Sequence, residues 1–351
     1  MPFQKSNRLL SKAETWLSEE LPFVTYRFPN EPNVQGVFQK DDTVNTYNDF
    51  RASGFVFAPF NATGKKILIT GKHEEGEMGE LPKNTTEKKI EISDAGREIH
   101  IKLVEGAIAE IKTGNLKKVV LSRPIKASTK KSPVQIFHDL LVKYTSAFCY
   151  CWYHPKIGMW LGATPEQLLQ YQNGEIFTTS LAGTLPIQIG EDPQWTSKEQ
   201  EEQQMVTDYI EASLHGKVDN LEVSKQKSLK AGKLWHLESK IKGKLNSAEH
   251  LGSLIRKLHP TPAICGLPKE RSLDFIVRNE NYDREFYTGY LGPVNLKQAD
   301  QTNLFVNLRC LKYLGKGQVM IFVGGGITAS SKPLREWEET QFKSRTILEV
   351  L

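Results

Sequence analysis

The stretch 148–183 constrains the fold more than any other part of the chain. It reads FCYCWYHPKIGMWLGATPEQLLQYQNGEIFTTSLAG, in which β-forming runs are broken by HPK and by NG. An Asn-Gly pair between apolar runs is a strong hairpin signal, so neighbouring strands should pair in antiparallel fashion. Strands that follow one another without a helix between them argue against a doubly wound parallel sheet.

Helical segments separate this region from other strands. Apolar residues at helical spacing predict helices over 94–114, 132–144, 196–214 and 247–258. KKVVLSRPI should form a strand that Pro124 ends, and NLFVNLRCLKYLGKGQVMIFVGGG should form two strands before a helix beginning at Pro333. The charged stretch 73–94 is expected to be a surface loop. The pattern predicts an α+β fold with largely antiparallel sheets.

The composition excludes several classes of protein. A hydrophobic content of 39% fits a packed core, and a net charge of +5 falls short of a nucleic-acid-binding surface. No signal-peptide pattern and no run of about 18 apolar residues is present, so we expect neither export nor a membrane span. Four cysteines without a C-x-x-C pair fit a reducing cytoplasm better than a zinc site or disulfides.

The stretch FVGGGITASSKPLREWEET, residues 322–340, carries an apparent nucleotide signature. Gly324, Gly326 and Ala329 match the spacing G-x-G-x-x-A, but such a site needs a following helix and strand, and the remaining chain indicates one helix only. The match is therefore accidental. Glycines at a strand end expose backbone N–H groups that can bind a carboxylate; a tight strand-to-helix turn is the alternative.

The last helix carries acidic residues on one face. Glu336 and Glu339 are three residues apart, and Lys343 lies one turn beyond Glu339. A solvated, salt-bridged face is the usual explanation for such a pattern.

The helix over 196–214 offers a second pair of acids. Glu199, Glu202, Val206 and Ile210 fall along one stripe, so two carboxylates continue an apolar face toward the interior. Two helices that present acids inward could share a hard divalent cation, most plausibly Mg²⁺. For Glu199 a capping box with Thr196 is the alternative.

Four further residues are candidates for chemistry or binding. Lys118 shares a strand face with buried positions, and a buried lysine can act as a general base, although most lysines at strand starts are solvated. Glu166 follows a Gly-Ala-Thr-Pro turn and either caps a helix or points into a pocket as an acid. Arg309 within an apolar strand needs an anionic partner if it faces inward. His259 precedes a proline, where structural packing is the ordinary role.

Eight segments stand in the order of a known family. They are KKVVLSR, GATPEQLL, SLAGT, SKEQEEQQMV, LHPTPAICGLP, REFYTGYLG, NLRC and GGGITASSKPLREWEET. In this order they resemble the chorismate-utilising enzymes, most closely the isochorismate synthases, from about Gly54 to the C-terminus. The resemblance implies a single chorismate-binding domain over 1–351, a layered sandwich with helices outside, in which 1–50 is the less family-like part.

The resemblance also implies roles for these residues. Lys118 would be the base that activates water, and Glu166 the acid that protonates the departing hydroxyl. Glu202 and Glu339 would bind Mg²⁺, assisted by Glu199 and Glu336. The residues expected to contact chorismate are Ala182, Gly183, Thr184, His259, Ala263, Ile264, Tyr287, Arg309, Gly325, Gly326 and Lys343. The implied reaction adds water at ring carbon 2 and removes the hydroxyl at carbon 4, which gives isochorismate.

The resemblance separates this chain from relatives with other nucleophiles. The ammonia-using anthranilate synthases lack the base lysine, which is present here as Lys118. Ala182 stands where aminodeoxychorismate synthases commonly carry a lysine. Water is therefore the expected nucleophile. We expect no glutaminase subunit, and we expect the chain to be a monomer. A salicylate synthase, which goes on to expel pyruvate, and a catalytically silent binding protein are the alternatives. Gln203 replaces a usual histidine and Leu185 a common arginine, and the product could feed menaquinone or siderophore synthesis.

Overall fold

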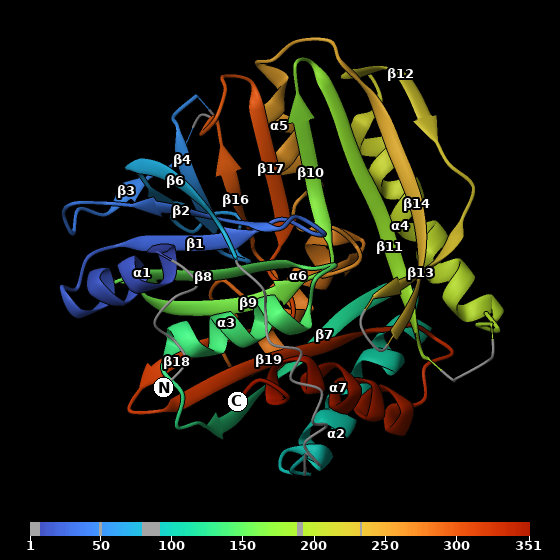
Figure 1. The fold of residues 1–351 in the computed structure, drawn as a ribbon. Helices are drawn as coiled ribbons and strands as arrows, with labels where there is room; N and C mark the ends of the chain where they lie inside the picture. The colour runs from blue at the N-terminus through green and yellow to red at the C-terminus, as the bar shows by residue number, and fades with distance from the viewer. Residues whose placement is uncertain (1–7, 49–50, 79–91, 188–191, 232–233) are drawn as a thin grey trace.

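The computed structural model describes residues 8–48, 51–78, 92–187, 192–231 and 234–351. Two large antiparallel sheets form its framework, which confirms the predicted α+β class (Figure 1). The nine-stranded sheet has the order β15-β7-β19-β18-β9-β8-β1-β2-β6, and the ten-stranded sheet the order β12-β14-β11-β10-β17-β16-β4-β5-β3, with β13 also paired to β14.

The strands of the first sheet are β1 Phe23–Arg27, β2 Asn33–Phe38, β6 Lys72–Glu77, β7 Lys118–Ser128, β8 Phe148–His154, β9 Gly158–Thr164, β15 Gly266–Leu267, β18 Cys310–Gly315 and β19 Gln318–Ile327. Those of the second are β3 Asn45–Thr46, β4 Gly54–Ala58, β5 Ile67–Ile69, β10 Gln167–Gln172, β11 Glu175–Pro186, β12 Val218–Val223, β13 Lys227–Ala231, β14 Leu234–Leu245, β16 Tyr290–Val294 and β17 Gln301–Val306. The expected hairpins β8–β9 and β10–β11 are present.

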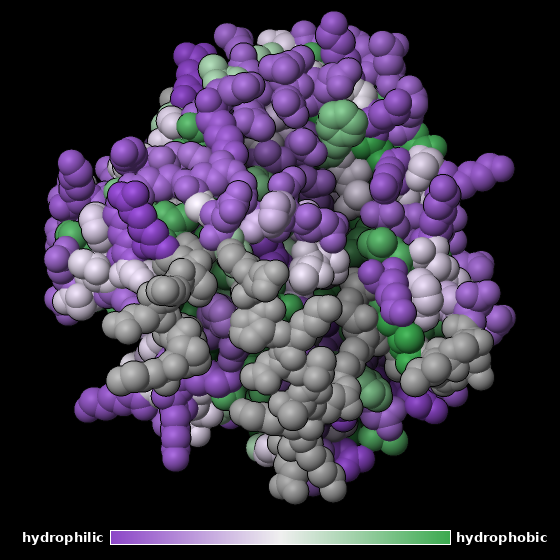
Figure 2. All heavy atoms as spheres, in the orientation of Figure 1, coloured by the Kyte–Doolittle hydropathy of each residue, from purple (hydrophilic) through white to green (hydrophobic). Residues whose placement is uncertain are grey.

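Seven helices occur in the described ranges: α1 Arg8–Ser18, α2 Arg97–Lys112, α3 Pro133–Lys143, α4 Ser197–Leu214, α5 His250–Leu258, α6 Lys269–Asn279 and α7 Pro333–Leu348. Helices α1, α3 and α7 lie in front of the nine-stranded sheet, whereas α4 and α5 cover the ten-stranded sheet (Figure 1). Each buries the apolar stripe that its sequence spacing predicts, as Val206 and Ile210 of α4 do. None of these helices is long and apolar enough to span a bilayer, and the face in Figure 2 is largely hydrophilic.

An aromatic core joins the two sheets. Phe148 of β8 stacks on Phe305 of β17 with ring centroids 4.1 Å apart, and Phe57 of β4 stacks on Phe286 at 4.3 Å. The N-terminal region takes part in this core because Tyr26 of β1 packs against both Phe148 and Phe55. Strands from the first 70 residues belong to both sheets.

Several expectations for individual elements were wrong. β7 continues past Pro124 to Ser128, because β7 pairs there with β19 on one side and its partner on the other side, β15, reaches only Lys118 and Val119. Part of the expected loop over 73–94 is strand β6, and 79–91 lies outside the described residues. Helices α1 and α6 and strands β12 to β14 were not predicted.

The glycines of 324–326 also lie elsewhere than expected. They are inside β19 and pair with Ser122, Leu121 and Val120 of β7, so they form neither a strand end nor a turn. Upstream, the expected two strands are three, because the chain turns between β17 and β18 with Arg309 in a left-handed conformation (φ 47°). The helix that begins at Pro333 is confirmed.

Candidate active site

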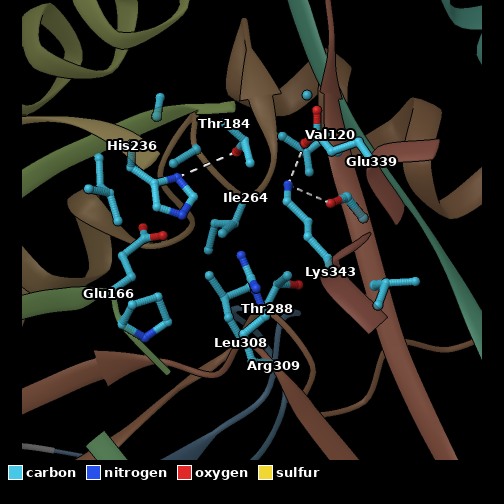
Figure 3. Close-up of a pocket in the computed structure, with 18 of the residues that line it drawn as sticks. Val120, Glu166, Thr184, His236, Ile264, Thr288, Leu308, Arg309, Glu339 and Lys343 are labelled. Atoms are coloured by element: carbon cyan, nitrogen blue, oxygen red, sulfur yellow. Dashed lines mark hydrogen bonds and ion pairs between the residues drawn. The ribbon is translucent and has the colours of Figure 1, made fainter. Parts of the chain in front are cut away.

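One cavity gathers most of the predicted site residues. It is lined by Glu166, Ala182, Gly183, Thr184, Glu202, Ala263, Ile264, Tyr287, Arg309, Gly325, Gly326, Glu339 and Lys343. These side chains come from both sheets and from helices α4 and α7. Figure 3 shows Glu166 and His236 on one side of the cavity and Glu339 and Lys343 on the other.

Lys118 begins β7 and is completely buried. Its Nζ lies 2.8 Å from Oε1 of Glu202, the acid that α4 directs inward. Gly326 of β19 makes room for this pair, because a Cβ built there would stand 2.4 Å from Glu202 Oε1 and 2.9 Å from Lys118 Cε. A side chain at this position would therefore displace the Lys118–Glu202 pair. Of the two possibilities for Lys118, the structure shows the buried one, but Lys118 does not itself line the cavity and lies behind Gly326, which does.

Glu166 lies in the link between β9 and β10 and does not cap a helix, since a strand follows it. Its backbone is fixed by hydrogen bonds with Val306 and with Thr164 Oγ1. Burial raises the pKa of the Glu166 carboxyl to about 7, against the opposing effect of Lys118 and of Lys343. A carboxyl that keeps its proton near neutral pH can serve as a general acid.

Cationic and aromatic groups line the remainder of the cavity. Lys343 donates to Gly324 O at 2.9 Å and to Glu339 Oε1 at 2.5 Å. Arg309 is partly buried, and its Nη1 donates to Thr346 Oγ1 at 3.1 Å, which leaves other guanidinium donors for a ligand. The buried Tyr287 ring stacks on Phe322 with centroids 5.4 Å apart. The cavity thus favours an anion with a planar apolar part.

The predicted metal ligands meet around the glycines of β19. A Cβ on Gly325 would lie 3.3 Å from Glu339 Oε1 and 3.6 Å from Glu336 Oε2, and Glu202 lies beside Gly326. As the side chains stand, no group of three or more acidic, histidine or cysteine side chains in the described ranges is arranged to hold a metal ion. Each of these carboxylates instead pairs with a lysine.

The donor set nevertheless fits Mg²⁺. Carboxylate oxygens are the ligands this ion prefers, and Glu336 Oε2 is buried without a hydrogen-bond partner in the described part of the chain. Burial and the neighbouring charge of Glu339 raise the pKa of Glu336, against the opposing effect of Lys198. Glu199 differs, because its Oε2 accepts the backbone N–H of Thr196 at 3.0 Å in a capping box. The alternative reading of Glu199 as a cap is confirmed.

His259 does not line this cavity, contrary to expectation. It caps the C-terminus of α5, and its buried ring packs edge-on against Tyr290 with centroids 5.0 Å apart. Pro59 and Arg256 line the same small cavity as His259, which is separate from the one described above. Burial lowers the pKa of His259 to about 3, so the ring is neutral. The ordinary packing role fits this placement.

His236 of β14 lines the cavity and was missed in the sequence. Its Nδ1 lies 2.8 Å from Gly183 O and 3.4 Å from Thr184 Oγ1, so it holds the bulged segment of β11 (Figure 3). Burial lowers the pKa of His236 to about 3. Alternation of Ile241 with the exposed Lys240 and Lys242 was the available signal for this strand.

The two departures from the family pattern lie away from the reacting groups. Gln203 is fully buried, and its amide contacts Ser180, Thr207 and Ser239 while its Oε1 accepts from Gln226 at 2.7 Å. It therefore joins α4 to the ten-stranded sheet. Leu185 pairs with Trp235 in β11–β14 and does not line the cavity.

Comparisons with known proteins agree with this geometry. A family model described as chorismate binding enzyme matches residues 55–349. Isochorismate synthase EntC of Escherichia coli (strain K12) is 34% identical over 263 residues, and isochorismate synthase DhbC of Bacillus subtilis (strain 168) is 31% identical over 272. Each match covers 71% of this chain and 66% of the relative, just under two thirds of its length.

Solved structures show the same fold. The crystal structure of a putative 2,3-dihydroxybenzoate-specific isochorismate synthase, DhbC from Bacillus anthracis, has a TM-score of 0.81 at 22% identity and covers 96% of this chain and 99% of that one. MenF, the menaquinone-specific isochorismate synthase from Escherichia coli, has a TM-score of 0.78 at 21% identity, covering 100% of this chain and 93% of that one.

Proposed function

This chain belongs to the chorismate binding enzymes, and we propose that it is an isochorismate synthase. The observation that carries the proposal is a carboxyl with a pKa of about 7, Glu166, that lines an anion-binding cavity and feels the charge of the buried Lys118 behind it. The similarity to isochorismate synthases over 71% of the chain supports the same substrate.

The reaction requires one proton to be removed and one to be supplied. Lys118 in its amine form takes a proton from water, whose oxygen forms a bond to ring carbon 2. The ring double bonds shift, the bond between carbon 4 and its hydroxyl breaks, and Glu166 supplies the proton that lets this group leave as water. Atoms balance, because one water enters and one leaves. No covalent enzyme intermediate is needed.

The substrate carries two carboxylates, and the cavity offers cations for them. We assign the enolpyruvyl carboxylate to Arg309 and Tyr287, with the backbone of Gly325 and Gly326 beside it, because the guanidinium retains free donors there. Lys343 adds a second positive charge at the same cavity. The aromatic and aliphatic wall, including Ile264, contacts the ring.

We further propose Mg²⁺ as the cofactor. Glu202 and Glu339 would hold it, with Glu336 assisting directly and Glu199 only through water, since Glu199 caps α4. When bound, the ion would supply positive charge for the ring carboxylate of chorismate. The unpartnered oxygen of Glu336 supports this assignment.

The activity is tested by incubating the purified protein with chorismate and Mg²⁺ and separating the products by chromatography. Isochorismate is the expected product. Salicylate together with pyruvate would instead identify a salicylate synthase, and unchanged chorismate would exclude both reactions. This one measurement distinguishes the proposal from its alternatives.

We also propose a compartment, an oligomeric state and candidate uses of the product. All four cysteines are buried free thiols, which fits a reducing cytoplasm. Water as nucleophile requires no ammonia-supplying glutaminase subunit, and we propose that the chain acts as a monomer. The relatives include both menaquinone-specific and 2,3-dihydroxybenzoate-specific enzymes, so menaquinone and siderophore synthesis are the two candidate uses of the product.

A further inference from the structure

Three lysines neutralise the three acidic side chains around Gly325 and Gly326. Lys118 lies 2.8 Å from Glu202 Oε1. Lys343 lies 2.5 Å from Glu339 Oε1, and Lys198 lies 2.8 Å from Glu336 Oε1. Each ammonium thus balances one carboxylate, and the cluster carries no net charge without a metal.

Lys198 differs from the other two lysines in how it is held. Lys118 is buried in a strand, and Lys343 is fixed by a second bond to Gly324 O. Lys198 is the second residue of α4, and its side chain is 25% exposed to solvent. Because a lysine stem is flexible and its head is readily hydrated, this ammonium can move to solvent at low cost.

Glu336 is the acid with the least complete set of partners. It is only 1% exposed, its Oε1 binds Lys198, and its Oε2 has no hydrogen-bond partner in the described ranges. That free oxygen is directed toward Gly325, where Oε1 of Glu339 also lies. Removal of Lys198 without replacement would leave a buried carboxylate uncompensated, which is costly.

We propose that Lys198 is an exchangeable counter-ion that occupies Glu336 in the metal-free protein and is displaced when a divalent cation binds. Lys198 and the metal therefore compete for the same carboxylate. The proposal rests on the Mg²⁺ site proposed above. It assigns to Lys198 a role that neither catalysis nor substrate binding requires.

The exchange has an electrostatic consequence for the substrate. Three carboxylates with three ammonium groups sum to zero, and replacing the single charge of Lys198 by the double charge of Mg²⁺ adds one positive charge to the cluster, whether Lys118 is an ammonium or an amine. Arg309 adds a further positive charge at the same cavity. The metal-loaded cluster is therefore more positive than the metal-free cluster, and it should attract a dianion more strongly.

The test measures Mg²⁺ binding by isothermal titration calorimetry without chorismate. Lys198→Met should lower the dissociation constant for Mg²⁺ by roughly tenfold, because a competing cation is gone. In EDTA the same variant should melt at a lower temperature than the wild type, and the rise in melting temperature on adding Mg²⁺ should be larger. Lys198→Gln gives a second variant of different polarity.

Lys332→Met is the matched control. Lys332 is exposed at the N-terminal cap of α7, the helix that carries Glu336, so its loss removes one charge without removing the ion pair. Its Mg²⁺ affinity should stay within about twofold of wild type. If Lys198→Met and Lys198→Gln bind Mg²⁺ no more tightly than the wild type, the proposal is wrong. Calorimetry needs no substrate, so this failure is separate from a failure to convert chorismate.

Discussion

Lys118 and Glu166 belong to different sheets, yet their charges interact across one cavity. Lys118 begins β7 of the nine-stranded sheet, and Glu166 precedes β10 of the ten-stranded sheet. Positive charge on Lys118 opposes the rise that burial causes in the pKa of Glu166. In the proposed reaction, the base would therefore come from a strand of one sheet and the acid from the link between the two sheets.

Replacement of the acid should stop the reaction without unfolding the protein. Glu166→Gln keeps the size of the side chain and removes the proton donor, so the turnover rate should fall by about 10²–10⁴-fold. The measurement is kcat for isochorismate formation, with the thermal midpoint as a check on folding. A variant that folds and turns over at a near-normal rate would refute the role of Glu166.

The pH dependence of turnover should report the same group. The pKa of Glu166 in the folded protein is about 7, above the ordinary value near 4.5, and the acid acts in its protonated form. The rate limited by this group should therefore fall as pH rises through about 7. The free energy of unfolding should change in the same direction. Between about pH 4.5 and 7 the native carboxyl keeps a proton that the unfolded chain has released, so the contribution of Glu166 to stability declines as pH rises through this range.

The stability part of this effect can be isolated with the amide variant. Glu166→Gln has no titrating group at this site, so its unfolding free energy should decrease less than that of wild type between about pH 4.5 and 7. Denaturant unfolding at several pH values measures this. Identical pH profiles for the two proteins would contradict the raised pKa.

Removal of a proposed metal ligand should abolish both the activity and its stimulation by Mg²⁺. Glu339 faces Gly325 and contributes one of the carboxylates at the site, so Glu339→Ala should lose both activity and its stimulation by Mg²⁺. Glu338→Ala is the control, since Glu338 lies on the same helix and pairs with the exposed Arg335 instead. Metal-stimulated turnover that survives in Glu339→Ala would refute the ligand assignment.

Gly326 of β19 should be more sensitive to an added side chain than Gly106 of α2. In Gly326→Ala the new Cβ would meet Glu202 Oε1 at 2.4 Å and Lys118 Cε at 2.9 Å, so we expect loss of activity and a destabilisation of about 1–3 kcal/mol. Gly106→Ala is the control: nothing lies within 4 Å of its Cβ, and its helical position should gain about 0.5–1 kcal/mol. Kinetics and thermal unfolding of both variants give the comparison.

Local pattern predicted much of the site because its residues stand at element ends or on amphipathic faces. Helical spacing placed Glu202 on the buried stripe of α4, and strand alternation placed Lys118 on a buried face. The side of the sheet on which His259 packs depends on contacts between distant segments, which one sequence does not encode locally. His236 was missed for a different reason: its strand was not predicted, and regular alternation would place His236 on the same face as the exposed Lys240 and Lys242.

Gln203 should contribute to stability through its buried hydrogen bonds. Its Nε2 lies 3.1 Å from both Thr207 Oγ1 and Ser239 Oγ, and its Oε1 accepts from Gln226. Gln203→Leu would remove these bonds and leave the buried Ser239 Oγ without this donor, so the free energy of unfolding should fall by about 1–3 kcal/mol.

The adjacent Gln204 provides the same substitution on the exposed side of α4. Its Nε2 donates only to the exposed Asp208, and Gln204→Leu should change stability by no more than about 0.5 kcal/mol. Chemical denaturation of both variants measures the difference. Gln203→His tests whether the usual family residue can occupy this position: it keeps polar atoms within reach of Ser180 and should recover part of the loss. Equal stability of the two leucine variants would show that the Gln203 hydrogen bonds contribute nothing to folding.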